Sequence, residues 1–202
     1  MNQTLRQVKD GLFYQNPLLV LLLGLSPALA LSTSLRKALA LAFVTSLVLF
    51  FSMLAASLLK NLLSPPITFI SHALLVAGFA GILEFFLRWY APNLSLEMGI
   101  FLPLTAVNSI IFAKLSRVEN QNIASSIVEG LGASIGFSGA ILLLAALREL
   151  LSGGTLFEVQ IFPEGIPVIE IVAHPVGGFL ILGLLCAALK TIGRSRKRRR
   201  VL

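Results

Sequence analysis

Six long apolar runs constrain most strongly what this chain can fold into. They cover roughly residues 17–34, 36–59, 67–88, 98–115, 122–147 and 172–192. Each is close to or above the length of about 20 residues that a helix needs to cross a bilayer. Hydrophobic residues make up 56% of the 202 and charged residues only 12%, which is far from the balance of a soluble domain. We predict an all-α integral membrane protein with six transmembrane helices in a single domain, residues 1–202.

The first and fourth runs carry a proline near their middle. Proline removes a backbone donor and clashes with the preceding turn, so each helix should kink or split there. Non-helical backbone at membrane depth is tolerated only where protein or a water-filled cavity covers it, and we therefore expect buried, inward-facing segments. The residues concerned are Ser26 and Pro27 in the first run and Pro103, Thr105, Asn108 and Ser109 in the fourth.

The two halves of the chain follow the same plan. Residues 17–88 and 98–192 each contain three runs, and each half begins with a broken one. Since three crossings reverse the direction of the chain, the second half should run opposite to the first, as in an inverted repeat. Ser26 and Ser109 should then approach each other near the midplane. A single break of this kind is also common in ordinary spanning helices.

Basic residues are unevenly distributed between the two sides of the predicted membrane. Most of the 16 Lys and Arg residues fall on one side once the N-terminus is placed inside, chiefly because of the basic tail at 193–202. Cytoplasmic segments carry such an excess, so both termini are predicted to be cytoplasmic. No aromatic residues alternate with the basic ones, and we do not expect nucleic-acid binding. We see no signal peptide at the N-terminus.

Carboxylates within or near the spans are candidates for ion transport, because an ionised group is costly inside the bilayer. Glu129 is the best of them, since several glycines follow it and would let a helix or a cavity approach closely. Glu84 lies one helical turn before Arg88, which favours a local ion pair. Glu149 beside Arg148 is expected at the end of a span, with the two side chains pointing in different directions. No catalytic motif supports an enzyme activity carried by this chain alone.

At these same residues the chain resembles the six-helix membrane subunits of the Rnf and Nqr complexes, RnfA/RnfE and NqrD/NqrE. The resemblance covers nearly the whole chain, and the GTLF loop and the tail are more similar to RnfE/NqrD. The stretches that carry it are NPLLVLLLGLSPALALSTSLRKALALAFVTSLVL, MGIFLPLTAVNSII, IVEGLGASIGFSGAILLLAALREL, GGTLF and HPVGGFLILGLLCAALKTI.

The resemblance implies a subunit of an ion-translocating oxidoreductase in the inner membrane of a prokaryote. Such a complex passes electrons between ferredoxin or NADH and its acceptor and moves Na⁺ or H⁺. The fold implied is two inverted three-helix repeats, paired with a pseudosymmetric RnfA/NqrE-like subunit. In the family each of the two subunits offers two cysteines to a shared 2Fe–2S cluster, in GLCP and TNC contexts.

Both cysteine positions are serine in this chain, at Ser26 and Ser109. A thiolate is soft and easily deprotonated, whereas a hydroxyl is hard and costly to ionise in an apolar site. We therefore expect the cluster to be impaired or absent. Three explanations stay open: a deliberate Cys-to-Ser replacement, a natural paralog that has lost the cluster, or a relative whose electrons take another path.

Two other hypotheses remain beside the complex subunit. A stand-alone secondary transporter would use the same broken helices, with Ser26, Thr33, Thr105, Asn108 and Ser109 as oxygen ligands for a hard cation. A purely structural subunit would move nothing, and Glu129→Gln would then leave all activity intact. Ion-path candidates under the leading hypothesis are Glu129, Asn108 and Thr105.

Overall fold

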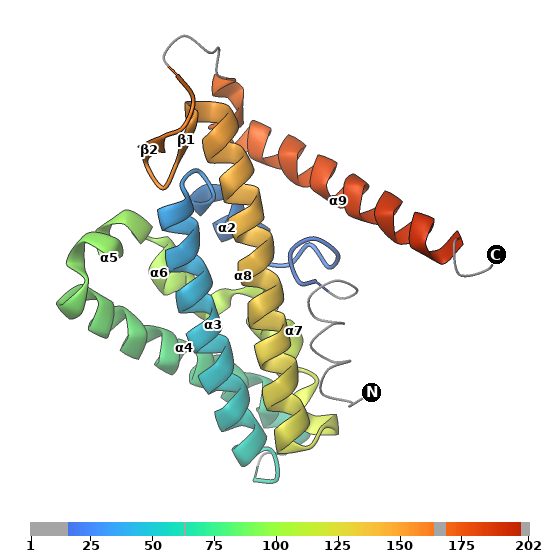
Figure 1. Cartoon of the computed structure of the whole chain (residues 1–202). Helices are drawn as coiled ribbons and strands as arrows, with labels where there is room; N and C mark the ends of the chain where they lie inside the picture. The colour runs from blue at the N-terminus through green and yellow to red at the C-terminus, as the bar shows by residue number, and fades with distance from the viewer. Residues whose placement is uncertain (1–15, 63, 164–168, 199–202) are drawn as a thin grey trace.

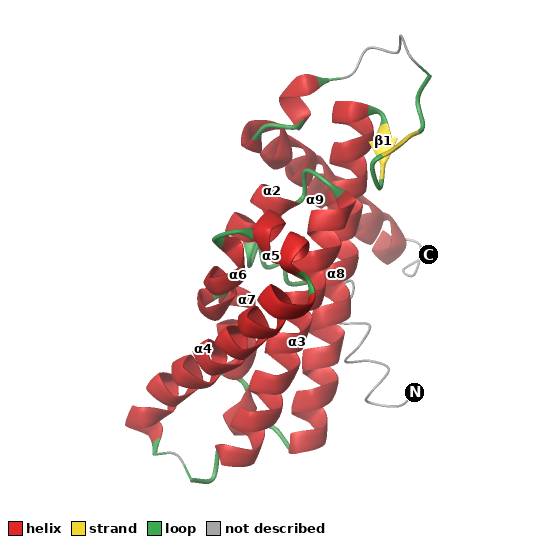
Figure 2. Cartoon of the chain, turned by 90° about the vertical axis from the view of Figure 1, so that its left-hand side faces the viewer, coloured by secondary structure: helices red, strands yellow, loops and turns green. Residues whose placement is uncertain are grey.

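The computed structural model describes residues 16–62, 64–163 and 169–198, and nearly all of this part is helical (Figure 2). Arg6 and Lys9, two basic residues of the N-terminal segment that is predicted to be cytoplasmic, lie outside the described residues. The elements are α2 (Leu25–Leu31), α3 (Leu35–Leu59), α4 (Pro65–Tyr90), α5 (Pro92–Met98), α6 (Phe101–Leu104), η2 (Thr105–Val107), α7 (Ser109–Leu115), η3 (Val118–Asn120), α8 (Ile123–Gly153), β1 (Thr155–Leu156), β2 (Val159–Gln160), η4 (Glu170–Val172) and α9 (Pro175–Arg198).

Helices α3 and α8 form the centre of the molecule and share its most extensive contact (Figure 1). They run antiparallel, because the backbone of Leu35 at the start of α3 bonds the Glu149 carboxylate near the end of α8. Halfway along, the hydroxyls of Ser46 and Ser138 lie 3.3 Å apart. Small residues allow the close approach, since a Cβ on Gly130 would lie 2.8 Å from the sulfur of Met53. Close packing of this kind is what holds helices together in a bilayer.

The other long helices diverge from this central pair. Figure 1 shows α4 and α9 extending to opposite sides of it. Much of α4 is exposed, including Phe69, Leu74, Phe85 and Trp89. In a membrane protein, such faces are covered by lipid or by other subunits. Short α5 and the β1–β2 hairpin lie near the start of α3, where Arg36 pairs with Glu97 at 3.3 Å.

The structure confirms a helical membrane fold, and four of the six predicted runs correspond to candidate spans. Four stretches of the described chain are long and apolar enough to cross a membrane, and the apolar part of α9 is shorter. They are Leu35–Leu59, Ile67–Tyr90, Phe101–Asn120 and Ile123–Gly153, with Pro175–Thr191 as the shorter one. The run at 17–34 does not form a spanning helix: it contains α2, which has 7 residues, after a series of turns. The expected ion pair of Glu84 with Arg88 is present at 2.6 Å.

Candidate functional site

The first broken run is interrupted at a glycine. Gly24 adopts φ 68° and ψ 25° and directly precedes α2. Glycine takes this left-handed conformation without the steric cost that a Cβ brings. The turns before it are fixed by Asn16, whose side-chain oxygen accepts hydrogen bonds from the backbone of Leu18 and Leu19. The Asn16 amide also donates to the Gly136 carbonyl of α8 at 2.8 Å, so the turns are attached to the central helix pair.

The second broken run is interrupted at Asn108. Its backbone is extended, with φ −70° and ψ 121°, between η2 and α7. The side-chain oxygen of Asn108 accepts a hydrogen bond from the Ile110 backbone at 3.1 Å. Asparagine is one of the preferred residues for this helix-capping role, because its oxygen satisfies a donor that the first turn leaves free. Asn108 therefore caps the N-terminus of α7.

Neither proline is the break itself, which corrects the prediction. Pro27 lies in the first turn of α2 and Pro103 lies in the first turn of α6. Backbone N–H groups in the first turn have no partner within their helix, so proline is tolerated there. The helices are interrupted at Gly24, three residues before Pro27, and at Asn108, five residues after Pro103.

The two breaks meet. The Gly24 N–H donates a hydrogen bond to the Ser109 Oγ at 2.9 Å, across 85 residues of sequence. A Cβ at Gly24 would lie 2.7 Å from Ile110 Cδ1 and 3.2 Å from Asn108 Oδ1. Ser26 follows two residues later in the first turn of α2. We call this set the junction: Gly24, Ser26, Asn108 and Ser109.

The junction opens to the surface of the chain. Asn108 is buried, but Ser26 and Ser109 are both exposed. The expectation of wholly buried, inward-facing segments was therefore wrong for these two side chains. The hydroxyl of Thr105, another predicted site residue, is buried and donates to the Phe101 carbonyl at 3.1 Å. The Asn108 Nδ2 is buried and has no partner among the described residues.

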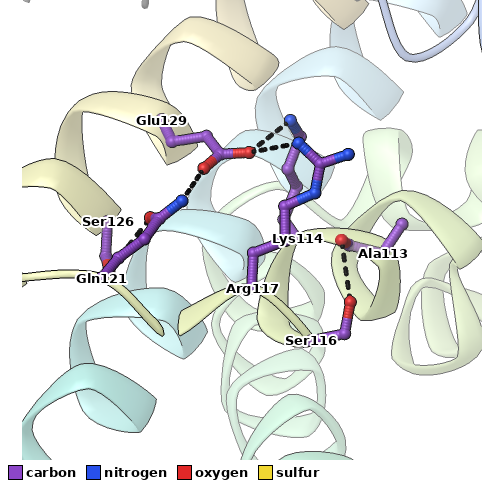
Figure 3. Close-up of polar contacts among 7 residues, drawn as sticks. All are labelled: Ala113, Lys114, Ser116, Arg117, Gln121, Ser126 and Glu129. Atoms are coloured by element: carbon purple, nitrogen blue, oxygen red, sulfur yellow. Dashed lines mark hydrogen bonds and ion pairs between the residues drawn. The ribbon is translucent and has the colours of Figure 1, made fainter. Parts of the chain in front are cut away.

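Glu129 occupies a separate polar cluster at the other end of α7 (Figure 3). Its Oε1 accepts from Lys114 Nζ at 2.8 Å and from Arg117 Nη1 at 3.2 Å. Its Oε2 accepts from the Gln121 side chain at 2.5 Å. Lys114 is only 3% exposed, so the pair is largely removed from solvent. Two cations and an amide thus stabilise the negative charge of Glu129, the carboxylate that the sequence analysis singled out.

The structure does not bring Glu129 to the junction. Ser109 begins α7 and Lys114 lies five residues further along the same helix. At 1.5 Å per residue the two positions are about 7–8 Å apart along the helix axis. The predicted residues therefore divide into two places: Ser26, Asn108 and Ser109 at the junction, with Thr105 close by in sequence, and Glu129 in the polar cluster.

Arg148 holds the end of α2, a role that the sequence analysis missed. It is fully buried, and its guanidinium donates to Leu29 O and Ser32 Oγ, both at 2.6 Å, at the end of that helix. It also donates to the carbonyls of Val172, Ala173 and His174, at 3.1, 2.9 and 3.2 Å. These bonds use all five N–H donors of an arginine. The sequence offered one signal of this role: Arg148 is a charged residue directly after the apolar run at 122–147.

Metal-ligand groups are scarce in the part of the chain that the structure describes. No set of three or more His, Cys, Asp and Glu residues there could hold a metal ion. The single cysteine of the sequence, Cys186, lies in α9 with its Sγ 3.2 Å from the Leu19 carbonyl oxygen. The junction itself offers hydroxyl and amide groups.

Long apolar helices around a pair of interrupted ones define a multi-pass membrane protein. Comparison with known sequences gives the family. A family model described as "Rnf-Nqr subunit, membrane protein" matches residues 4–186. The chain belongs to the Rnf-Nqr family of membrane subunits, which confirms the resemblance inferred from the sequence motifs.

Curated relatives match over almost their full length. The chain is 33% identical to the E subunit of the Na(+)-translocating ferredoxin:NAD(+) oxidoreductase complex of Acetobacterium woodii, over 90% of this chain and 93% of the relative. It is 34% identical to the E subunit of the ion-translocating oxidoreductase complex of Shewanella denitrificans, over 98% of this chain and 92% of the relative. It is 29% identical to the E subunit of the proton-translocating ferredoxin:NAD(+) oxidoreductase complex of Clostridium ljungdahlii, over 94% of this chain and 90% of the relative.

Proposed function

We propose that this chain is the E-type membrane subunit of an ion-translocating oxidoreductase complex. Such a complex would transfer electrons between ferredoxin or NADH and its acceptor and couple this to Na⁺ or H⁺ movement. The observation that carries the proposal is the near full-length similarity to relatives that are named for that activity. This similarity favours the complex over a stand-alone transporter.

The open junction supports a partner subunit of the RnfA/NqrE type. Gly24 and Asn108 interrupt their helices, and the neighbouring Ser26 and Ser109 are exposed. Irregular backbone does not occur facing lipid within the hydrocarbon region, because its polar groups would be left unsatisfied. At membrane depth, protein or a water-filled cavity must therefore cover the junction, and we infer that a second subunit does so. A pseudosymmetric second subunit would fit the proposed inverted repeat of residues 17–88 and 98–192.

The distribution of charge supports termini on the cytoplasmic side of the bacterial inner membrane. Lys60 and Lys114 lie at one end of the central helix pair, where Lys60 donates to the Gln121 carbonyl and Lys114 pairs with Glu129. Arg36, Lys37 and the buried Arg148 lie at the opposite end, so the predicted excess comes chiefly from the basic tail at 193–202. Applied to the whole sequence, the positive-inside rule favours cytoplasmic termini.

Co-purification tests membership of the complex directly. A tagged chain extracted in mild detergent should bring down a second membrane subunit and the redox subunits. Membranes that contain it should show ferredoxin- or NADH-driven ion uptake that is lost when the gene is deleted. Both ²²Na⁺ uptake and acidification should be measured, since the names of the relatives include each ion. A chain that purifies as a stable monomer would contradict the proposal.

Glu129, Asn108 and Thr105 remain our candidates for the ion path. An ion that reaches Glu129 would compete with Lys114 and Arg117 for its oxygens. We expect Glu129→Gln to reduce redox-driven ion uptake at least about tenfold while the complex still assembles. The neutral amide carries no negative charge with which to bind the transported cation. Glu84→Gln, which alters an ion pair with the exposed Arg88, is the matched control. Unchanged uptake in Glu129→Gln would assign the cluster a structural role only.

A further inference from the structure

The junction combines an intact backbone arrangement with side chains of the wrong chemistry for a metal cluster. Within the Rnf-Nqr family, to which the resemblance assigned a shared 2Fe–2S cluster, the residues at 26 and 109 would be its ligands. Here both are serine. Iron–sulfur clusters are held mostly by thiolates, and a hydroxyl in an apolar site is costly to ionise.

The rest of the sequence cannot supply the thiols that the junction lacks. Cys186 cannot supply the missing thiols, because it is the one cysteine of the sequence and its Sγ lies 3.2 Å from the Leu19 carbonyl oxygen. The residues present do not fit a 2Fe–2S cluster.

The backbone, in contrast, offers a hydrogen bond of the kind that cluster sulfurs accept. Gly24 directs its N–H at the atom carried by residue 109. Hydrogen bonds of this kind to cluster sulfurs tune the potential of iron–sulfur centres. Ser26 and Ser109 are both exposed, so ligands from a second subunit could meet them. Exchanging each Oγ for Sγ would change one atom at each position and leave Gly24 and Asn108 untouched.

We propose that the junction is a cluster scaffold whose ligand atoms have been replaced, and that this chain carries no electron-transfer group. This inference rests on the proposed function, because it assumes the partner subunit of the complex. In such a complex the chain would contribute to ion movement and assembly, while electrons would follow a path that does not use Ser26 or Ser109.

The test compares the purified complex containing the wild-type chain with one containing Ser26→Cys/Ser109→Cys. Iron, acid-labile sulfide and the electron paramagnetic resonance spectrum of the reduced sample are measured as differences from wild type. The double variant should gain one 2Fe–2S equivalent and a new spectrum. The control is Ser46→Cys/Ser138→Cys, whose serine hydroxyls also lie close together, 3.3 Å apart, but away from the junction. It should gain neither under reducing conditions.

Two results would overturn the inference. The first is a 2Fe–2S signal in the wild-type complex that disappears in Ser26→Ala/Ser109→Ala. The second is a double cysteine variant that assembles with its partner and gains no cluster. If the cysteine variant fails to assemble, the comparison of wild type with the alanine variant still decides whether hydroxyls hold a cluster. Failure of the wild-type chain to co-purify with a partner would instead count against the proposed function.

Discussion

Replacing Arg148 by methionine is expected to lower the free energy of unfolding by more than about 3 kcal/mol, because five acceptors lose their donor at once. Two of these acceptors belong to the end of α2 and three to the segment from η4 to the start of α9. No carboxylate among the described residues lies within salt-bridge distance of Arg148. Thermal unfolding of the purified chain in detergent measures the effect.

Two further variants serve as comparisons for Arg148→Met: one keeps the charge at residue 148, and the other removes an exposed arginine elsewhere. Arg148→Lys keeps the charge but has three donors at a single point in place of a planar fork, and we expect an intermediate loss. Arg88→Met removes a cation that is 68% exposed and paired with Glu84, and we expect a loss below about 1 kcal/mol. An Arg148→Met variant that unfolds like wild type would mean that water or lipid replaces these bonds.

Gly24→Ala should be the most damaging small change at the junction. A left-handed backbone costs a residue with a Cβ about 1–2 kcal/mol, and overpacking adds about 1–3 kcal/mol. The added Cβ would lie 2.7 Å from Ile110 Cδ1 and 3.2 Å from Asn108 Oδ1, so these side chains would have to shift. We expect a destabilisation of about 2–5 kcal/mol and a loss of partner binding, both measured on the detergent-extracted protein.

Gly78→Ala provides the control for this substitution. Gly78 lies in α4, and a Cβ there would meet nothing within 4 Å. Alanine is the better helix former by about 0.5–1 kcal/mol, so stability should be unchanged or slightly higher. Equal stability of Gly24→Ala and Gly78→Ala would show that the junction accommodates the added methyl group by shifting the Ile110 side chain.

The sequence predicted the membrane fold because apolar length is a local property. The runs at 36–59 and 122–147 correspond to α3 and α8, although α8 extends further, to Gly153. The run at 17–34 was predicted less well, since its turns depend on Asn16 and its distant bond to Gly136. No local pattern records a bond across 120 residues of sequence.

The junction could be predicted in outline and not in detail. The bond between Gly24 and Ser109 brings the two broken segments together, and the approach of Ser26 to Ser109 near the midplane stays a prediction. The prolines drew attention away from Gly24 and Asn108, because a first-turn proline and a helix-breaking proline look alike in a sequence. The anchoring role of Arg148 was hidden for another reason: its acceptors come from two distant segments, at 29–32 and 172–174.

Helix α8 holds both halves of the junction from its two ends. Arg148 fixes the end of α2, and Glu129 fixes the end of α7 through Lys114. These two anchors are separated by nineteen residues of continuous helix, about 28 Å at 1.5 Å per residue. The number of residues between Glu129 and Arg148 therefore determines where α2 and α7 meet. An insertion or deletion of one residue would turn one anchor by about 100° relative to the other, so evolution can vary the composition of this segment far more freely than its length.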